Sequence, residues 1–167
     1  MLYNIIAKLD EKLHFSTVSA HCDIPCKIYD PIVAQLAVLT IIRMVDLIDE
    51  LKEKPTLTLA DQAQFQRLIN QKEEHGLKVK NEINVIWGDY IKAPQLAQFP
   101  ELHELVHNIM LASSKAKQHI DKEASLALLV LVNRFAEIFW TTKGIETYMA
   151  TCPYPPAQTL VYPKLVV

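Results

Sequence analysis

The clearest fold signal in this chain is the run Asp30-Pro31-Ile32-Val33-Ala34-Gln35-Leu36-Ala37-Val38-Leu39-Thr40-Ile41-Ile42-Arg43-Met44-Val45-Asp46-Leu47-Ile48, residues 30–48. Asp30 is a favourable helix cap, and Pro31 suits the first helical position because no backbone hydrogen bond is needed there. Apolar residues then recur with helical spacing, and Pro55 ends the pattern. The run therefore predicts a long helix that ends before Pro55.

Three more segments have the same helical character. The further helices are predicted over these stretches: Leu59 to about Trp87, Phe99-Pro100-Glu101 onward, and the residues after Asp121 to about Gly144. Thr58 caps the second helix, Gly76 interrupts or softens its middle, and Pro94 closes that region. Four such helices with short connectors predict an all-α fold, an antiparallel four-helix bundle over residues 31–146.

The composition agrees with one helical domain. The chain has 167 residues, of which 50% are hydrophobic and only three are glycine, and few runs alternate at period two. The formal charge of -2 gives no sign of a nucleic-acid partner. No apolar run reaches the roughly 18 residues of a membrane-spanning helix, and the run at residues 124–132 is predicted to be buried in the bundle.

The C-terminal residues 147–167 have a different character. Four prolines between Thr151 and Pro163 cannot continue a helix, so we expect an extended tail. Its apolar residues Leu160, Val161 and Tyr162 suggest packing on the bundle or on a neighbouring subunit. Disorder is the alternative.

The cysteines indicate a metal or redox site. Cys22 and Cys26 lie four residues apart beside His21, whereas Cys152 is isolated and is interpreted as incidental. Taken alone, this spacing is weak evidence and leaves a zinc site or a structural disulfide open. His103 and His107 are also spaced for a shared metal, but we interpret them as exposed or hydrogen-bonded helix residues.

The first twenty residues are interpreted as a cleavable leader. Val18-Ser19-Ala20 resembles a signal-peptidase site, but charged residues between positions 8 and 12 interrupt the apolar region that export requires. Apolar residues at positions 2, 5, 6 and 9 instead fit a short amphipathic helix. We therefore expect a cytoplasmic protein.

Several stretches, in order along the chain, resemble the nickel-dependent superoxide dismutase family. The first comprises Thr17-Val18-Ser19-Ala20, then His21-Cys22-Asp23-Ile24-Pro25-Cys26, then Ile28-Tyr29-Asp30-Pro31. The others are Ile86–Pro94, Phe99–Val106 and Ile138–Lys143. The matches span residues 17 to 143, so the chain resembles a precursor of this family with its leader at 1–20 and a nickel hook at 21–30.

The resemblance implies an enzyme that disproportionates superoxide to dioxygen and hydrogen peroxide by Ni(II)/Ni(III) cycling. It also implies one nickel ion per subunit, a homohexamer and a leader-processing peptidase. The implied nickel ligands are His21, Cys22 and Cys26. The other implied site residues are Tyr29 and Tyr90 at the substrate access, Asp23 holding the hook, and Lys92 as a nearby positive charge. The Ile24-Pro25 peptide is a candidate cis bond.

Leader removal would create one of these ligands. An N-terminal amine titrates near pH ~8 and can lose its proton to a metal, whereas the nitrogen of the Ala20-His21 peptide bond has no basic lone pair. The His21 amine, the Cys22 backbone nitrogen and two thiolates form a planar set that suits Ni(II), and the imidazole remains for the axial position. Cleavage is therefore predicted to switch the site on.

Three positions depart from the family pattern. Lys27 replaces a usual glycine, which costs about 1–2 kcal/mol if the site needs a positive φ. Ala37 and His75 stand where a glutamate and its arginine partner are expected, and loss of such support can cost roughly 10–100-fold in activity or metal affinity. The alternative function is therefore a catalytically weak or inactive nickel-binding homologue.

Overall fold

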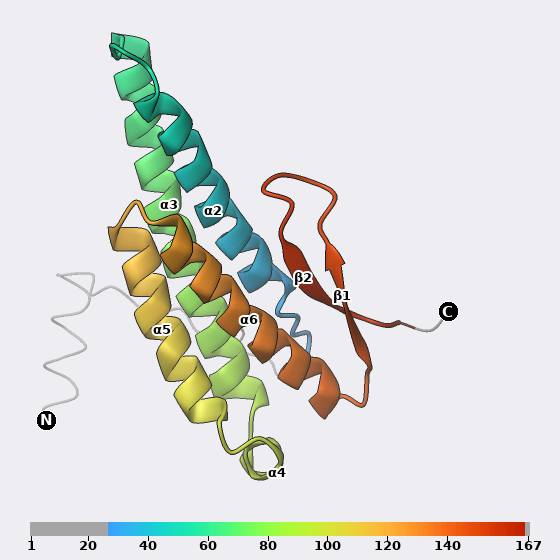
Figure 1. Ribbon diagram of the computed structural model, residues 1–167. Helices are drawn as coiled ribbons and strands as arrows, with labels where there is room; N and C mark the ends of the chain where they lie inside the picture. The colour runs from blue at the N-terminus through green and yellow to red at the C-terminus, as the bar shows by residue number, and fades with distance from the viewer. Residues whose placement is uncertain (1–26, 166–167) are drawn as a thin grey trace, which may run out of the picture.

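The computed structural model describes residues 27–165. Its elements are α2 (Ile32–Lys52), α3 (Leu59–Val85), η1 (Ile86–Tyr90), α4 (Ala93–Gln98), α5 (Leu102–Gln118), α6 (Lys122–Thr142), β1 (Thr147–Thr151) and β2 (Thr159–Pro163). Helices α2, α3, α5 and α6 form an antiparallel four-helix bundle in which each packs on two neighbours (Figure 1). The predicted all-α fold class is confirmed.

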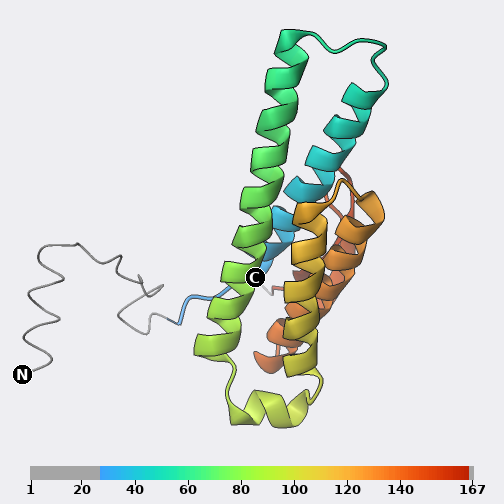
Figure 2. The same ribbon diagram turned by 90° about the vertical axis from the view of Figure 1, so that its left-hand side faces the viewer.

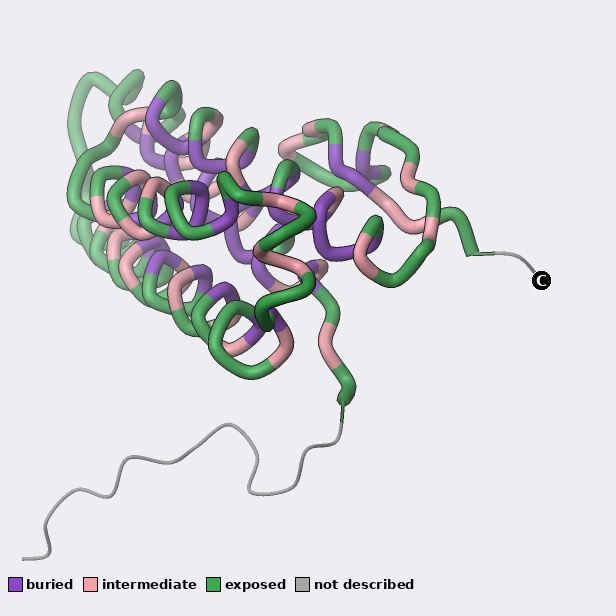
Figure 3. Tube along the Cα trace, turned by 90° about the horizontal axis from the view of Figure 1, so that it is seen from below, coloured by how far each residue is buried: buried purple, intermediate pink, exposed green. Residues whose placement is uncertain are grey.

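The bundle encloses one main apolar core, with buried residues facing inward between the helices (Figure 3). Helices α2 and α3 extend beyond the ends of α5 and α6 (Figure 2). A second, smaller core lies in this projecting pair and consists of Ile48, Leu51 and Leu68. The two long helices therefore need their own apolar contacts where α5 and α6 no longer cover them.

Side chains at the helix starts explain where the helices begin. Thr58 Oγ1 accepts the backbone N–H of Asp61 at 3.2 Å, and the Asp61 carboxylate accepts the N–H of Thr58 at 2.9 Å, which completes a capping box. The Thr58 cap is thus confirmed. The Asp30 carboxylate likewise accepts the N–H of Ile32 at 2.8 Å. Pro31 itself precedes the first helical residue.

Helix α6 is the only helix within residues 27–165 that is long and apolar enough to cross a membrane by length and composition. The most apolar part of it is 61% buried inside the bundle. A helix in the core of a bundle has the same length and apolar composition, and Leu128, Val132 and Phe135 of α6 are buried in this way.

Two local expectations were wrong. Pro94 does not close a helical region, because it lies in the first turn of the short helix α4, where a missing N–H costs nothing. Gly76 does not interrupt α3, which is continuous from residue 59 to residue 85. Gly76 instead allows α3 to approach α5, since a Cβ there would lie 2.7 Å from the Cβ of Lys117. Ser113 of α5 donates a hydrogen bond to the Gly76 carbonyl at 2.8 Å.

A buried lysine strengthens the same α3–α5 contact. Lys72 is 1% exposed, and its ammonium donates to the carbonyls of Ala116 and Lys117 in the last turn of α5. Burial lowers the pKa of Lys72. Its methylene stem fills the interface while its charge satisfies carbonyls that a helix end leaves without partners.

The C-terminal segment forms a hairpin of two antiparallel strands, β1 and β2, against α2 and α6. Disorder is excluded for the part of the tail within the described residues. Buried Asn133 of α6 accepts the N–H of Val161 at 3.3 Å and donates to the carbonyl of Thr159 at 2.9 Å. Gln35 of α2 donates to Asn133 at 2.9 Å and to the carbonyl of Val161 at 3.0 Å. The two amides occupy the edge of β2 as a third strand would.

Candidate functional site

The sequence-predicted metal ligands His21, Cys22 and Cys26 lie outside the described residues, as do Asp23 and the Ile24-Pro25 peptide. The described chain begins at Lys27, whose φ is 60°. This left-handed conformation favours glycine, and a lysine pays about 1–2 kcal/mol for it. The conformational requirement inferred for this position is therefore present.

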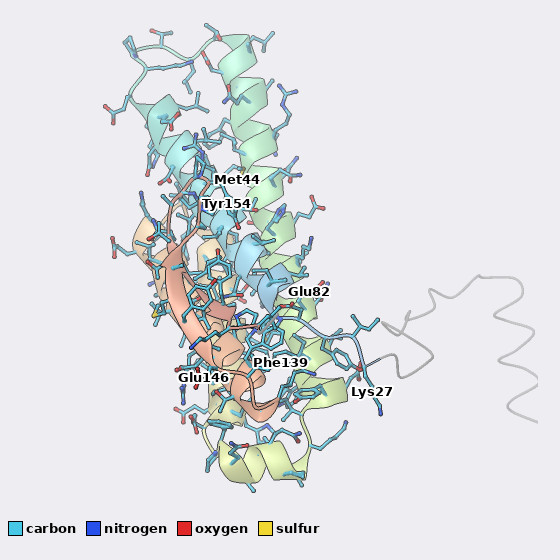
Figure 4. All side chains as sticks on the ribbon, turned by 90° about the vertical axis from the view of Figure 1, so that its right-hand side faces the viewer. Lys27, Met44, Glu82, Phe139, Glu146 and Tyr154 are labelled. Carbon is cyan, nitrogen blue, oxygen red and sulfur yellow. The ribbon has the colours of Figure 1, made fainter. Side chains whose placement is uncertain are left out.

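The structure brings Tyr29 and Tyr90 together. Tyr29 belongs to the segment that leads into α2, and Tyr90 ends the π-helical turn η1. Their ring centroids lie 6.0 Å apart with the planes tilted by 45°. The ring of Tyr90 also lies 5.0 Å from that of Phe139 on α6, so three segments meet at one aromatic cluster. Figure 4 shows Phe139 inside this end of the bundle and Lys27 at its outer edge.

The cation at this cluster is Lys143, which the sequence analysis did not single out. Its ammonium lies 4.7 Å from the ring centroid of Tyr90 and 5.0 Å from that of Phe139, within the range of a cation–π interaction. The only sequence signal was its place at the end of the matching stretch Ile138–Lys143.

Lys92 is placed differently. Its ammonium donates to the carbonyl of Gly88 at 2.9 Å, and among the contacts described for residues 27–165 it touches neither tyrosine ring. Its charge lies two residues along the chain from Tyr90, so it adds positive potential near the cluster without contacting it.

The hydroxyl of Tyr90 is hydrogen-bonded to Thr142 at the end of α6. The two oxygens lie 2.8 Å apart. Thr142 in turn donates to the carbonyl of Phe139 at 2.7 Å. Tyr90 is therefore held at its ring by Phe139 and Lys143 and at its hydroxyl by Thr142.

Two of the three positions that depart from the family pattern, Ala37 and His75, carry no ion pair among the described residues. Ala37 is 2% exposed and packs in the apolar core. His75 Nδ1 lies 2.8 Å from the carbonyl of Gln71 on its own helix. Neither residue supplies the carboxylate or the guanidinium that the pattern leads one to expect.

The remaining candidate ligands do not form a metal site among residues 27–165, where no group of three or more His, Cys, Asp or Glu side chains is placed to hold an ion. His103 accepts a hydrogen bond from the indole of Trp87 at 3.0 Å, which agrees with its interpretation as a hydrogen-bonded helix residue. Cys152 is buried in the hairpin, and its thiol contacts the carbonyl of Tyr154 at 3.3 Å.

Comparison with known proteins adds an independent finding. A family model described as nickel-containing superoxide dismutase matches residues 16–143. The superoxide dismutase [Ni] of Streptomyces coelicolor is 35% identical over 128 residues, which cover 76% of this chain and 91% of that protein. The enzyme of the same name from Streptomyces seoulensis is 35% identical over 127 residues, covering 75% and 90%.

Solved structures agree with the sequence comparison. A native nickel superoxide dismutase structure superposes with a TM-score of 0.66 and 30% identity, covering 74% of this chain and 99% of that one. An apo nickel superoxide dismutase gives a TM-score of 0.62 and 26% identity, covering 70% and 98%. The hairpin of β1 and β2 lies outside the family match, which ends at residue 143.

Proposed function

The chain belongs to the nickel-containing superoxide dismutase family, and from this membership we propose how its own residues carry out the reaction. The protein disproportionates superoxide to dioxygen and hydrogen peroxide and uses nickel as its cofactor. Family membership supports this enzyme over the alternative of an inactive nickel-binding homologue.

The proposed nickel ligands are the amine and imidazole of His21, the backbone nitrogen and thiolate of Cys22, and the thiolate of Cys26. Soft thiolates combined with nitrogen donors fit nickel better than they fit a hard cation, so the donor set suits the ion. Bound nickel would supply the one-electron donor and acceptor that the two halves of the reaction need. Asp23 is proposed to hold the hook in place.

The observation that carries this proposal is the contact of Tyr29 with Tyr90. Tyr29 follows Cys26 by three residues, so the ring contact attaches the end of the hook to η1 and α6. The positive φ of Lys27 lies within the same short connection. We propose that the two tyrosines restrict access to the metal ligands to small molecules.

Positive charge at the same place would favour an anionic substrate. The ammonium of Lys143 lies on the Tyr90 ring, and Lys92 adds a second charge nearby. Lysines at the mouth of a site raise the local concentration of a small anion and its rate of encounter. We propose that Lys143 has the larger effect because it contacts the cluster directly.

Processing, assembly and location are further parts of the proposal. Removal of residues 1–20 by a peptidase would expose the His21 amine, and the mature chain would assemble as a homohexamer in the cytoplasm. The support is the leader composition, together with a family match that begins at residue 16 and so includes the junction.

The experiment that tests the proposal compares the chain beginning at His21 with the full precursor. Both are loaded with nickel, and superoxide consumption and nickel content are measured. We expect activity in the mature form alone and its loss in Cys22→Ser and Cys26→Ser, whereas the matched control Cys152→Ser stays active. Equal activity in the precursor would refute the amine switch, and nickel-loaded mature protein without activity would refute the function.

A further inference from the structure

The proton of the Thr142 hydroxyl has a fixed destination. A threonine hydroxyl has one hydrogen to donate and two lone pairs to accept with. Thr142 donates this hydrogen to the carbonyl of Phe139 at 2.7 Å. The short contact of 2.8 Å between Thr142 and Tyr90 must then use the phenolic hydrogen of Tyr90.

The end of α6 explains why the Thr142 hydrogen stays there. The last carbonyls of a helix lack their usual donor four residues along. Lys143, which would bond to Phe139 in a continuing helix, directs its N–H to the carbonyls of Thr141 and Trp140. The Thr142 hydroxyl therefore satisfies a carbonyl that would otherwise lose its partner if the hydrogen turned towards Tyr90.

We propose that Thr142 is a positioning residue that makes Tyr90 a hydrogen-bond acceptor towards any further partner, the substrate included. The inference rests on the proposed function, and it deepens it by assigning the direction of one proton. With its hydrogen committed to Thr142, Tyr90 has only oxygen lone pairs left for any further hydrogen bond. Phe139 and Lys143 hold the ring in the orientation that this arrangement requires.

The assignment has a chemical consequence for the reaction. Reduction of superoxide to hydrogen peroxide takes up one electron and two protons for each molecule of peroxide. Tyr90 does not deliver either proton in this arrangement. It accepts a hydrogen bond from a species that carries one, such as a water molecule or the protonated product, and the protons themselves come from solvent or from another group.

The test compares Thr142→Val with Thr142→Ser. Valine keeps the shape and removes the acceptor, whereas serine keeps the hydroxyl. The primary readout is the tyrosine Fermi doublet in ultraviolet resonance Raman spectra, which reports whether a phenol donates a hydrogen bond. Because the chain from His21 onward has five tyrosines, at positions 29, 90, 148, 154 and 162, the Tyr90 signal is taken as the difference from the matching Tyr90→Phe protein. Spectra are recorded on the metal-free and the nickel-loaded mature protein.

We expect the Tyr90 signal to lose its donor character in Thr142→Val and to keep it in Thr142→Ser. Loss of one hydrogen bond to the phenol should lower kcat/KM by about 2- to 10-fold at unchanged nickel content, with serine restoring most of it. Circular dichroism checks folding, and Thr142→Ala serves as a second variant without a hydroxyl if valine disturbs the helix end.

An unchanged Tyr90 signal in both the valine and the alanine variants would overturn the assignment. So would a signal in the wild-type protein that shows Tyr90 as a pure acceptor. If the signal shifts as expected while no form consumes superoxide, the hydrogen-bond assignment stands and the proposed function fails. The two failures are therefore distinguishable.

Discussion

Replacement of Gly76 by alanine should destabilise the protein, although the same change stabilises most helices. Alanine gains about 1 kcal/mol over glycine in a helix interior. At Gly76 the added Cβ would lie 2.7 Å from the Cβ and 3.2 Å from the Cδ of Lys117, and the first of these atoms cannot rotate away. The helices must separate, which also stretches the hydrogen bond from Ser113 and the contacts of Lys72.

The expected size follows from these opposing terms. Overpacking of a tight interface costs about 1–3 kcal/mol. We expect the upper end of this range at Gly76, because the new Cβ would also lie 3.2 Å from the Cδ of Lys117. After subtraction of the helix-propensity gain, the free energy of unfolding should fall by about 1–2 kcal/mol. With a urea m-value of about 2 kcal/mol/M, the unfolding midpoint should fall by about 0.5–1 M.

The measurement is urea unfolding followed by circular dichroism, at one protein concentration because assembly shifts apparent stability. Gly88→Ala is the matched control, since a Cβ at Gly88 meets nothing within 4 Å. We expect the control to unfold at the wild-type midpoint or slightly above it. A Gly76→Ala protein as stable as this control would refute the close approach of α3 and α5.

Three further predictions test the hairpin, the hook and the acid response. Asn133→Ala removes three hydrogen bonds and should lower the free energy of unfolding by about 2–3 kcal/mol. The Val161 amide should also exchange its hydrogen faster. Unchanged exchange would contradict the role of Asn133 at the edge of β2. Lys27→Gly should relieve about 1–2 kcal/mol of left-handed strain, offset by about 0.5–1 kcal/mol because glycine has more freedom in the unfolded chain. The matched control Lys27→Ala removes the charge and keeps the strain. Against a chelator, the glycine variant should therefore retain nickel slightly better than the alanine variant. The ammonium of Lys54 at 2.5 Å lowers the pKa of Asp61 to about 2, so this carboxylate stabilises the fold above its unfolded pKa of about 4, and the contribution is lost as pH falls towards about 2. Asp61→Asn should flatten that part of an acid titration followed by circular dichroism, and an unchanged profile would exclude the ion pair as its cause.

Most of the bundle could be predicted because its signals are local. Helical spacing of apolar residues and caps such as Thr58 act within a few residues of chain, and they predicted four helices whose order and antiparallel arrangement the structure confirms. The short helix α4 was not predicted, because a proline indicates a helix end unless its place in the first turn of a new helix is known. The hairpin was not predicted, because the prolines of the tail indicated an extended segment and its two strands are only five residues long each.

The candidate site divides in the same way. The metal ligands are neighbours in sequence, within a stretch that resembles the family, and that resemblance implied them. Their spacing alone left a zinc site or a disulfide open, and they stay a prediction. The partners of Tyr90 come from α6, far along the chain, and no local pattern reports that Thr142 binds its hydroxyl or that Lys143 covers its ring.

The sequence by itself determined the helices, their order and the cluster of nitrogen and sulfur donors at the proposed new N-terminus, because each depends on covalent neighbours. Only the tertiary structure decided the sign of a change at Gly76, the third-strand role of Asn133 and the direction of the Tyr90 proton. Each of these depends on which atoms of a distant segment lie within about 3–4 Å, and packing of whole elements sets such distances.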